Sequence, residues 1–133
     1  MKVDPYLFFQ GRCEEALDFY RTAVGAQIDA VIRFRDMPQA GVTNAPDKVM
    51  HAAFRIGETT LLASDGDNTG SPTFGGFSLS LSAESDAEAA RLFAALAEGG
   101  QVRMPLGPTP FASSFGMLAD RFGVPWMIVR QTV

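Results

Sequence analysis

The sequence repeats itself at an offset of 74 residues, and this duplication constrains the fold more than any single motif does. The matched pairs are Glu14 with Glu88, Ala16 with Ala90, Phe19 with Phe93, Ala23 with Ala97, Gly25 with Gly99, and Gln27 with Gln101. Each copy has the pattern of a strand, an amphipathic helix that ends at a glycine, and three further strands. The sequence therefore predicts an α+β fold built from two βαβββ modules in tandem.

The element pattern of the two copies can be followed along the chain. In the first copy we expect strands at 3–9, 28–35, 48–56 and 59–64 and a helix at 12–24, whose buried face is Cys13, Ala16, Leu17, Tyr20 and Val24. In the second copy we expect strands at 77–82, 101–105, 111–119 and 124–131 and a helix at 86–98, whose buried face is Ala89, Leu92, Phe93 and Leu96. A capping box of Ser85 and Glu88 begins the second helix. The breaker-rich segment 65–76 joins the copies.

The length of 133 residues suits a single domain with module one at about 1–65 and module two at about 77–133. Each half is too small to form a stable core alone, so we expect the modules to pack as paired curved mixed sheets with a central cleft. Small-molecule sites favour such clefts. Short sheets also leave strand edges and apolar faces to cover, which favours a homodimer.

Composition excludes several classes of function. The net charge of −4, with two lysines and scattered arginines, argues against nucleic acid as a partner. No apolar run approaches the length of a membrane span, so no membrane partner is expected. The first residues lack the pattern of a signal peptide. The single cysteine, Cys13, rules out an internal disulfide and fits a reducing cytoplasm.

Several segments resemble the PhnB-like branch of the vicinal oxygen chelate superfamily, which includes glyoxalases, bleomycin-resistance proteins and extradiol dioxygenases. The segments that carry the resemblance are 5–7 (PYL), 13–20 (CEEALDFY), Gly25, 48–52 (KVMHA), Ile56-Gly57, Ser64-Asp65, Gly99-Gly100, Val102, 104–106 (MPL), Phe115-Gly116, 120–123 (DRFG) and Trp126-Met127. The resemblance covers essentially the whole chain and implies a glyoxalase-like fold. Some members of the branch carry the label 3-demethylubiquinone 3-methyltransferase, but this sequence has no glycine-rich loop for S-adenosylmethionine.

The resemblance also implies where a divalent metal would be held, because enzymes of the superfamily take His, Gln or Glu ligands from the first and last strand of each module. Those positions here are Pro5, Ser64 or Asp65, the strand 77–81, and Met127. A proline has no side-chain donor and a thioether is a poor ligand for these metals. We therefore expect neither an intrinsic metal nor another cofactor. A pair of His51 and Asp65 would bind at most a stray ion.

His51 is the only histidine, so any imidazole chemistry depends on it. We place it in strand 48–56 on one face with Val49, Ala53 and Arg55, and two interpretations stand: a structural sheet histidine or a ligand contact. Arg33 and Arg35 are either solvated strand charges or contacts to an anionic substrate. Cys13 lies in a first helical turn, as a core residue or a reactive thiol.

Aromatic side chains offer a candidate apolar wall. The residues are Phe9, Trp126, Phe111 and Phe115, and core packing explains them equally well. The predicted site joins the polar contacts of His51 and Arg33 to an apolar wall of Phe9, Trp126 and Met127, with Asp65 a further candidate. The sequence favours a protein that binds a small organic molecule in the cleft without a metal. The alternatives are a metal-dependent lyase, isomerase or dioxygenase, and a purely structural dimer.

Overall fold

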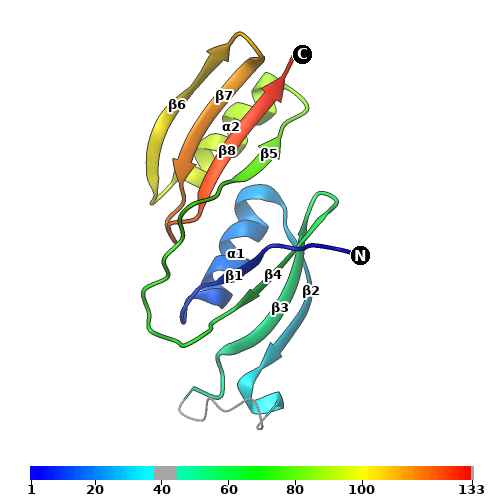
Figure 1. Ribbon diagram of the computed structural model, residues 1–133, viewed down its shortest axis with the longest axis vertical. Coiled ribbons are helices and arrows are strands. Elements are labelled where there is room, and N and C mark those ends of the chain that lie inside the picture. The colour runs from blue at the N-terminus through cyan, green and yellow to red at the C-terminus, as the bar shows by residue number, and fades with distance from the viewer. Residues whose placement is uncertain (38–44, 133) are drawn as a thin grey trace. The chain divides into compact units, whose positions relative to one another are not determined.

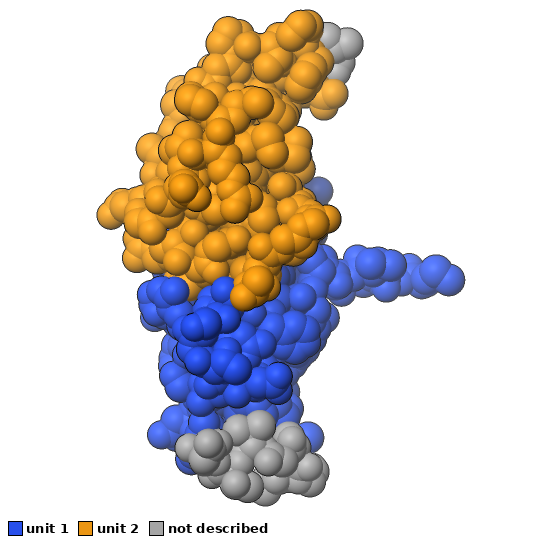
Figure 2. All heavy atoms as spheres, turned by 60° about the vertical axis from the view of Figure 1, so that its left-hand side comes forward, with its two compact units in different colours: residues 1–72 blue, residues 73–133 orange. Residues whose placement is uncertain are grey.

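The computed structural model describes residues 1–37 and 45–132, which fold into two compact units, Met1–Pro72 and Thr73–Val133 (Figures 1 and 2). Unit 1 contains β1 (Tyr6–Phe8), α1 (Cys13–Val24), β2 (Gln27–Arg33), the 3-10 turn η1 (Phe34–Asp36), β3 (Val49–Ile56) and β4 (Thr59–Ser64). Unit 2 contains β5 (Leu79–Ser82), α2 (Asp86–Ala97), β6 (Gln101–Thr109), β7 (Ala112–Ala119) and β8 (Pro125–Gln131). Among these elements no helix is long and apolar enough to cross a membrane.

The two units have the same topology. Each is a four-stranded mixed sheet, ordered β1-β4-β3-β2 in unit 1 and β5-β8-β7-β6 in unit 2. The first strand of each unit pairs in parallel with the last, and the other neighbours are antiparallel. The βαβββ order and the α+β class predicted from the sequence are therefore confirmed for both modules.

The core of unit 1 lies between α1 and one face of its sheet. The side chains buried there come from β1, β3 and β4 (Leu7, Ala52, Phe54, Leu61 and Ala63) and from α1 (Cys13, Ala16, Leu17, Tyr20 and Ala23). The ring of Tyr20 stacks on that of Phe54 with centroids 6.0 Å apart. The prediction that Val24 completes this face was wrong, because Ala23 is the buried residue of the last turn and Val24 lies at the edge of the stripe.

In unit 2 the predicted helix start and buried face are confirmed. The hydroxyl of Ser85 accepts a hydrogen bond from the Glu88 N–H at 3.0 Å, and the Glu88 carboxylate accepts one from the Glu84 N–H. The first bond satisfies an amide that a helix start otherwise leaves without a partner, and the second ties the residue before the N-cap to the first turn. The buried side chains of α2 are Ala89, Leu92, Phe93 and Leu96, as predicted.

The 74-residue offset describes only part of each module. Gly25 and Gly99 both have positive φ and are followed by strands that begin at Gln27 and Gln101, so the offset holds there. Inside the helices it places the buried Ala16 on the exposed Ala90. The helices themselves align at an offset of 73, because Glu98 adds one residue between the end of α2 and its glycine. This offset places the buried residues Ala16, Tyr20 and Ala23 on the buried residues Ala89, Phe93 and Leu96.

Two β-bulges alter the faces that simple alternation predicts in β2 and β3. The β2–β3 register shifts between Ile28 and Ala30, and again where Ile32 pairs with His51 but Arg33 pairs with Val49. Because a bulge inserts an extra residue, it reverses which face the following side chains occupy. The predicted common face of His51 and Val49 is therefore wrong: Val49 is fully buried, whereas His51 is half-buried.

Candidate functional site

The face of the unit 1 sheet that points away from α1 carries a cluster of aromatic and polar side chains. Leu7 points into the core, so its neighbours Tyr6 and Phe8 lie on the other face and are 39% and 49% exposed. The register places them beside the adjacent strands: Tyr6 pairs with Leu62, which in turn pairs with Ala53. We call Tyr6, Phe8 and His51 the Tyr6–His51 face.

A hydrogen bond joins two members of this face. The hydroxyl oxygen of Tyr6 lies 2.8 Å from Nδ1 of His51, across strands far apart in the sequence. The Tyr6 ring also stacks on that of Phe8, with centroids 5.0 Å apart and planes inclined by 29°. Partial burial, followed by the electrostatic effect of the Cys13 thiol, raises the pKa of the Tyr6 phenol, so it stays protonated at neutral pH. The cluster thus combines a flat apolar surface with an oriented imidazole.

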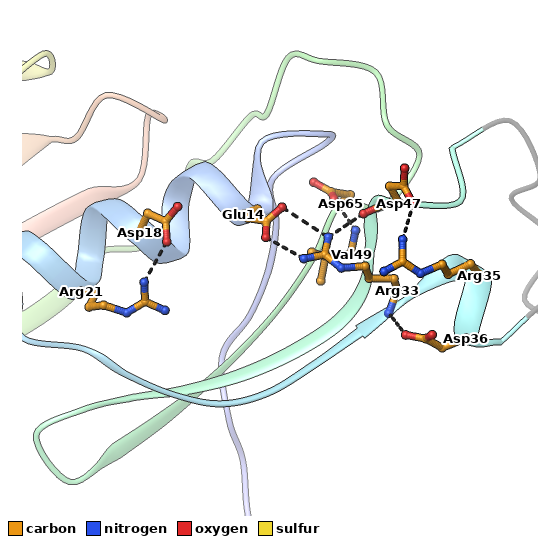
Figure 3. Close-up of polar contacts among 9 residues, drawn as sticks. All are labelled: Glu14, Asp18, Arg21, Arg33, Arg35, Asp36, Asp47, Val49 and Asp65. Atoms are coloured by element: carbon orange, nitrogen blue, oxygen red, sulfur yellow. Dashed lines mark hydrogen bonds and ion pairs between the residues drawn. The ribbon is translucent and has the colours of Figure 1, made fainter.

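Arg33 does not join His51. Its guanidinium holds the carboxylate of Glu14 in α1 with contacts of 2.6 Å and 3.3 Å, and it donates to the carbonyl oxygen of Asp47 at 2.6 Å (Figure 3). Because Ile32 is the residue that pairs with His51, its neighbour Arg33 lies on the α1 side of the sheet. Arg35 forms an ion pair with the carboxylate of Asp47. The predicted polar pair of His51 and Arg33 is not brought together.

Asp65 is a structural residue rather than a candidate ligand. It is 1% exposed, and one carboxylate oxygen accepts a hydrogen bond from the Cys13 N–H at 2.8 Å. The other oxygen accepts one from the Val49 N–H at 2.6 Å (Figure 3). The first of these caps α1 from the end of β4, since Arg12 at the N-cap position makes no side-chain cap. Because both carboxylate oxygens accept hydrogen bonds from buried amides, Asp65 does not form the ion-binding pair with His51 that the sequence analysis considered.

Cys13 is the core residue that one of the two sequence interpretations predicts. The thiol is fully buried in the first turn of α1. Burial, and then the negative charges of Asp65 and Glu14, raise its pKa to about 12. The thiolate needed for a nucleophile is therefore disfavoured, in spite of the favourable helix dipole.

Phe9 and Trp126, which were predicted to line one apolar wall, are core residues of different units. Phe9 is 0% exposed and packs near Tyr20 in the unit 1 core. Trp126 is 3% exposed in the unit 2 core, where its indole N–H donates to the buried carboxylate of Asp120 at 2.9 Å. Both follow the core-packing interpretation. Half-buried Met127 pairs with Ser80 and Met117 in the unit 2 sheet.

The residues at the superfamily's metal positions do not fit a divalent ion. Pro5 supplies only a backbone carbonyl, which accepts from the Leu62 N–H, and Met127 supplies a thioether. The carboxylate of Asp65 is filled by two amides. Within residues 1–37 and 45–132 no three His, Cys, Asp or Glu side chains gather closely enough to hold a metal.

Tyr6 and Phe8 are the site residues that sequence reasoning missed. The signal was present in the run Tyr6-Leu7-Phe8-Phe9, where strand alternation separates the first and third side chains from Leu7 and Phe9. Phe9, which was predicted for the apolar wall, lies in the core, whereas Tyr6 and Phe8 are exposed. The Tyr6–His51 bond depends on the tertiary fold, and no spacing in the sequence predicts it.

Comparison with known proteins agrees with this architecture. A family model described as 3-demethylubiquinone-9 3-methyltransferase matches residues 1–129. The chain is 35% identical to protein YjdN of Escherichia coli (strain K12), over 96% of this chain and 94% of that protein. It therefore belongs to this family, the PhnB-like branch of the vicinal oxygen chelate superfamily.

Solved structures give the same result for this PhnB-like chain. Protein PA1353 from Pseudomonas aeruginosa is 45% identical, with a TM-score of 0.87 and 98% of each chain covered. A putative 3-demethylubiquinone-9 3-methyltransferase, PhnB protein, from Bacillus cereus is 31% identical, with a TM-score of 0.83 over 98% of this chain and 99% of that one. A glyoxylase/bleomycin resistance protein/dioxygenase domain from Frankia sp. EAN1pec shares the fold alone, at 18% identity and a TM-score of 0.65 over 98% of this chain and 94% of that one.

Proposed function

We propose that this protein binds a small, flat organic molecule on the Tyr6–His51 face, without an intrinsic metal. The observation that carries the proposal is the pair of exposed, stacked rings of Tyr6 and Phe8 beside the only histidine of the chain. Large exposed aromatic side chains next to one another are typical of binding surfaces. An apolar surface with one placed polar group is the usual composition of a small-molecule site.

The energetics of such a surface favour an aromatic ligand. Phe8 and Tyr6 belong to β1, which is held by its parallel pairing with β4, so the rings are presented by a sheet rather than by a loop. A ligand ring that stacks on them gains about 1 kcal/mol beyond the apolar area it buries. The ring of His51, with its centroid 5.6 Å from that of Tyr6, adds a polar contact at the edge.

Two other activities are not favoured by the side chains present. A metal-dependent lyase, isomerase or dioxygenase needs ligands, and the candidate positions offer a proline, a thioether and an engaged carboxylate. Methyl transfer needs a site for S-adenosylmethionine. At the start of α1 the helix amide of Cys13 is already bonded to Asp65, and the preceding segment is not glycine-rich.

The proposal can be tested with protein labelled in its single histidine. A panel of aromatic fragments at millimolar concentration would be added while the imidazole resonances of His51 are followed by NMR. We expect at least one fragment to shift these resonances saturably. Phe8→Ala should weaken its binding about fivefold, since it removes one stacked ring.

Phe111 provides a matched control. It is 47% exposed, close to the 49% of Phe8, but it belongs to unit 2 and contacts Phe115. Phe111→Ala should leave the affinity unchanged. The proposal fails if no fragment shifts the His51 resonances, or if Phe8→Ala and Phe111→Ala weaken binding equally.

A further inference from the structure

The Tyr6–His51 hydrogen bond has a direction, and the direction decides which ligands the face accepts. The bond joins Oη of Tyr6 to Nδ1 of His51 at 2.8 Å, and either group can be the donor. If Tyr6 donates, Nδ1 is unprotonated and the neutral ring carries its proton on Nε2. If His51 donates, Nε2 presents a lone pair instead.

Chemistry favours Tyr6 as the donor. A phenol O–H is a stronger acid than the N–H of a neutral imidazole, and the imidazole nitrogen is the better acceptor. The raised pKa of the Tyr6 phenol keeps its proton in place at neutral pH. Within residues 1–37 and 45–132, Tyr6 is the only hydrogen-bond partner of the His51 ring, and it bonds to Nδ1 rather than to Nε2.

We propose that His51 offers its Nε2–H as the specificity-determining donor of this face, and that the ligand is a flat organic molecule with an acceptor oxygen such as a carboxylate or enolate. Tyr6 acts as a positioning residue, because its hydroxyl fixes the tautomer and orientation of the ring. This inference rests on the proposed function.

Nearby charges do not account for a preference for anions. Arg55 follows His51 on the same side of β3, and its guanidinium is bound to the carboxylate of Asp29 at 2.8 Å and to Gln27 at 2.7 Å. The net charge of the chain is −4. Long-range electrostatics therefore favours a cationic ligand, and a preference for an anion has to come from a local donor.

The tautomer can be measured directly on the intact protein. Because there is one histidine, a long-range ¹H–¹⁵N spectrum contains one imidazole. At about pH 8 we expect the Nε2–H tautomer in the wild type and a mixture of tautomers in Tyr6→Phe. An Nδ1–H tautomer in the wild type, or a tautomer that Tyr6→Phe leaves unchanged, would overturn the inference.

Two probes with the same ring and opposite hydrogen-bonding groups test the ligand class. Benzoate accepts hydrogen bonds only, and benzamidinium donates only. We expect benzoate to bind the wild type at least tenfold more tightly, and His51→Phe to remove this preference while both probes keep a weak, Phe8-dependent affinity. Equal Phe8-dependent binding of both probes to the wild type would refute the donor role but keep the proposed function. Absence of Phe8-dependent binding would refute both.

Discussion

Removing the Asp65 carboxylate should destabilise unit 1 by roughly 2–6 kcal/mol, about 1–3 kcal/mol for each of two buried amides. In Asp65→Ala the N–H groups of Cys13 and Val49 lose their acceptors at 2.8 Å and 2.6 Å, and both bonds are buried. A buried amide left without a partner costs about 1–3 kcal/mol. The bond from Cys13 is also the cap of α1, whose own N-cap residue supplies none. Asp65→Asn keeps one acceptor oxygen, so its free energy of unfolding should lie between those of Asp65→Ala and the wild type.

Urea unfolding followed by far-UV circular dichroism is the appropriate assay, because it reports both units. The fluorescence of Trp126, the only tryptophan, reports unit 2. Asp67→Ala is the control, since this aspartate is exposed two residues away and should change stability by less than about 0.5 kcal/mol. If Asp65→Ala costs no more than Asp67→Ala, the structural role of Asp65 is refuted.

Three further predictions concern other parts of the chain. Iodoacetamide should modify Cys13 slowly in the folded protein and quickly in urea. Because the pKa of the thiol is raised to about 12 in the folded protein, the free energy of unfolding should fall as pH rises above about 9, and Cys13→Ala should remove this fall. Arg33→Ala should leave fragment affinity unchanged and lower the free energy of unfolding by less than about 1 kcal/mol. Because Arg33 lowers the pKa of Glu14, the stabilisation by this pair in the wild type should be lost as pH falls, and Arg33→Ala should raise that pKa. Weakened fragment binding in Arg33→Ala would return Arg33 to the site. Light scattering should give the mass of a homodimer, and a monomer mass at all micromolar concentrations would contradict this.

The sequence was sufficient for the fold because local signals agree with one another in each module. Ser85 and Glu88 mark the start of α2, and Gly25 marks the end of α1, by mechanisms that do not depend on the rest of the chain. Buried residues of α2 follow directly from their spacing. The repeat was less reliable in detail, since one inserted residue after α2 shifts the helical equivalence without changing the topology.

The candidate site was less predictable, because it depends on contacts between distant segments. Alternation alone put Val49 with His51, and a bulge in the β2–β3 pairing separates them. Arg33 looked free in the sequence, but α1 brings Glu14 to it. Asp65 resembled a ligand by its position, but two buried amides require its carboxylate.

The central claim, that the Tyr6–His51 face binds an organic ligand without a metal, is tested most directly by removing metals. Purified protein would be analysed for its elements, and benzoate affinity would be measured before and after treatment with a chelator. We predict well below one metal ion per chain and the same affinity in both samples. About one ion per chain that survives dialysis against a weak chelator, with benzoate binding lost once a stronger chelator removes it, would contradict the account and favour a metal-dependent enzyme.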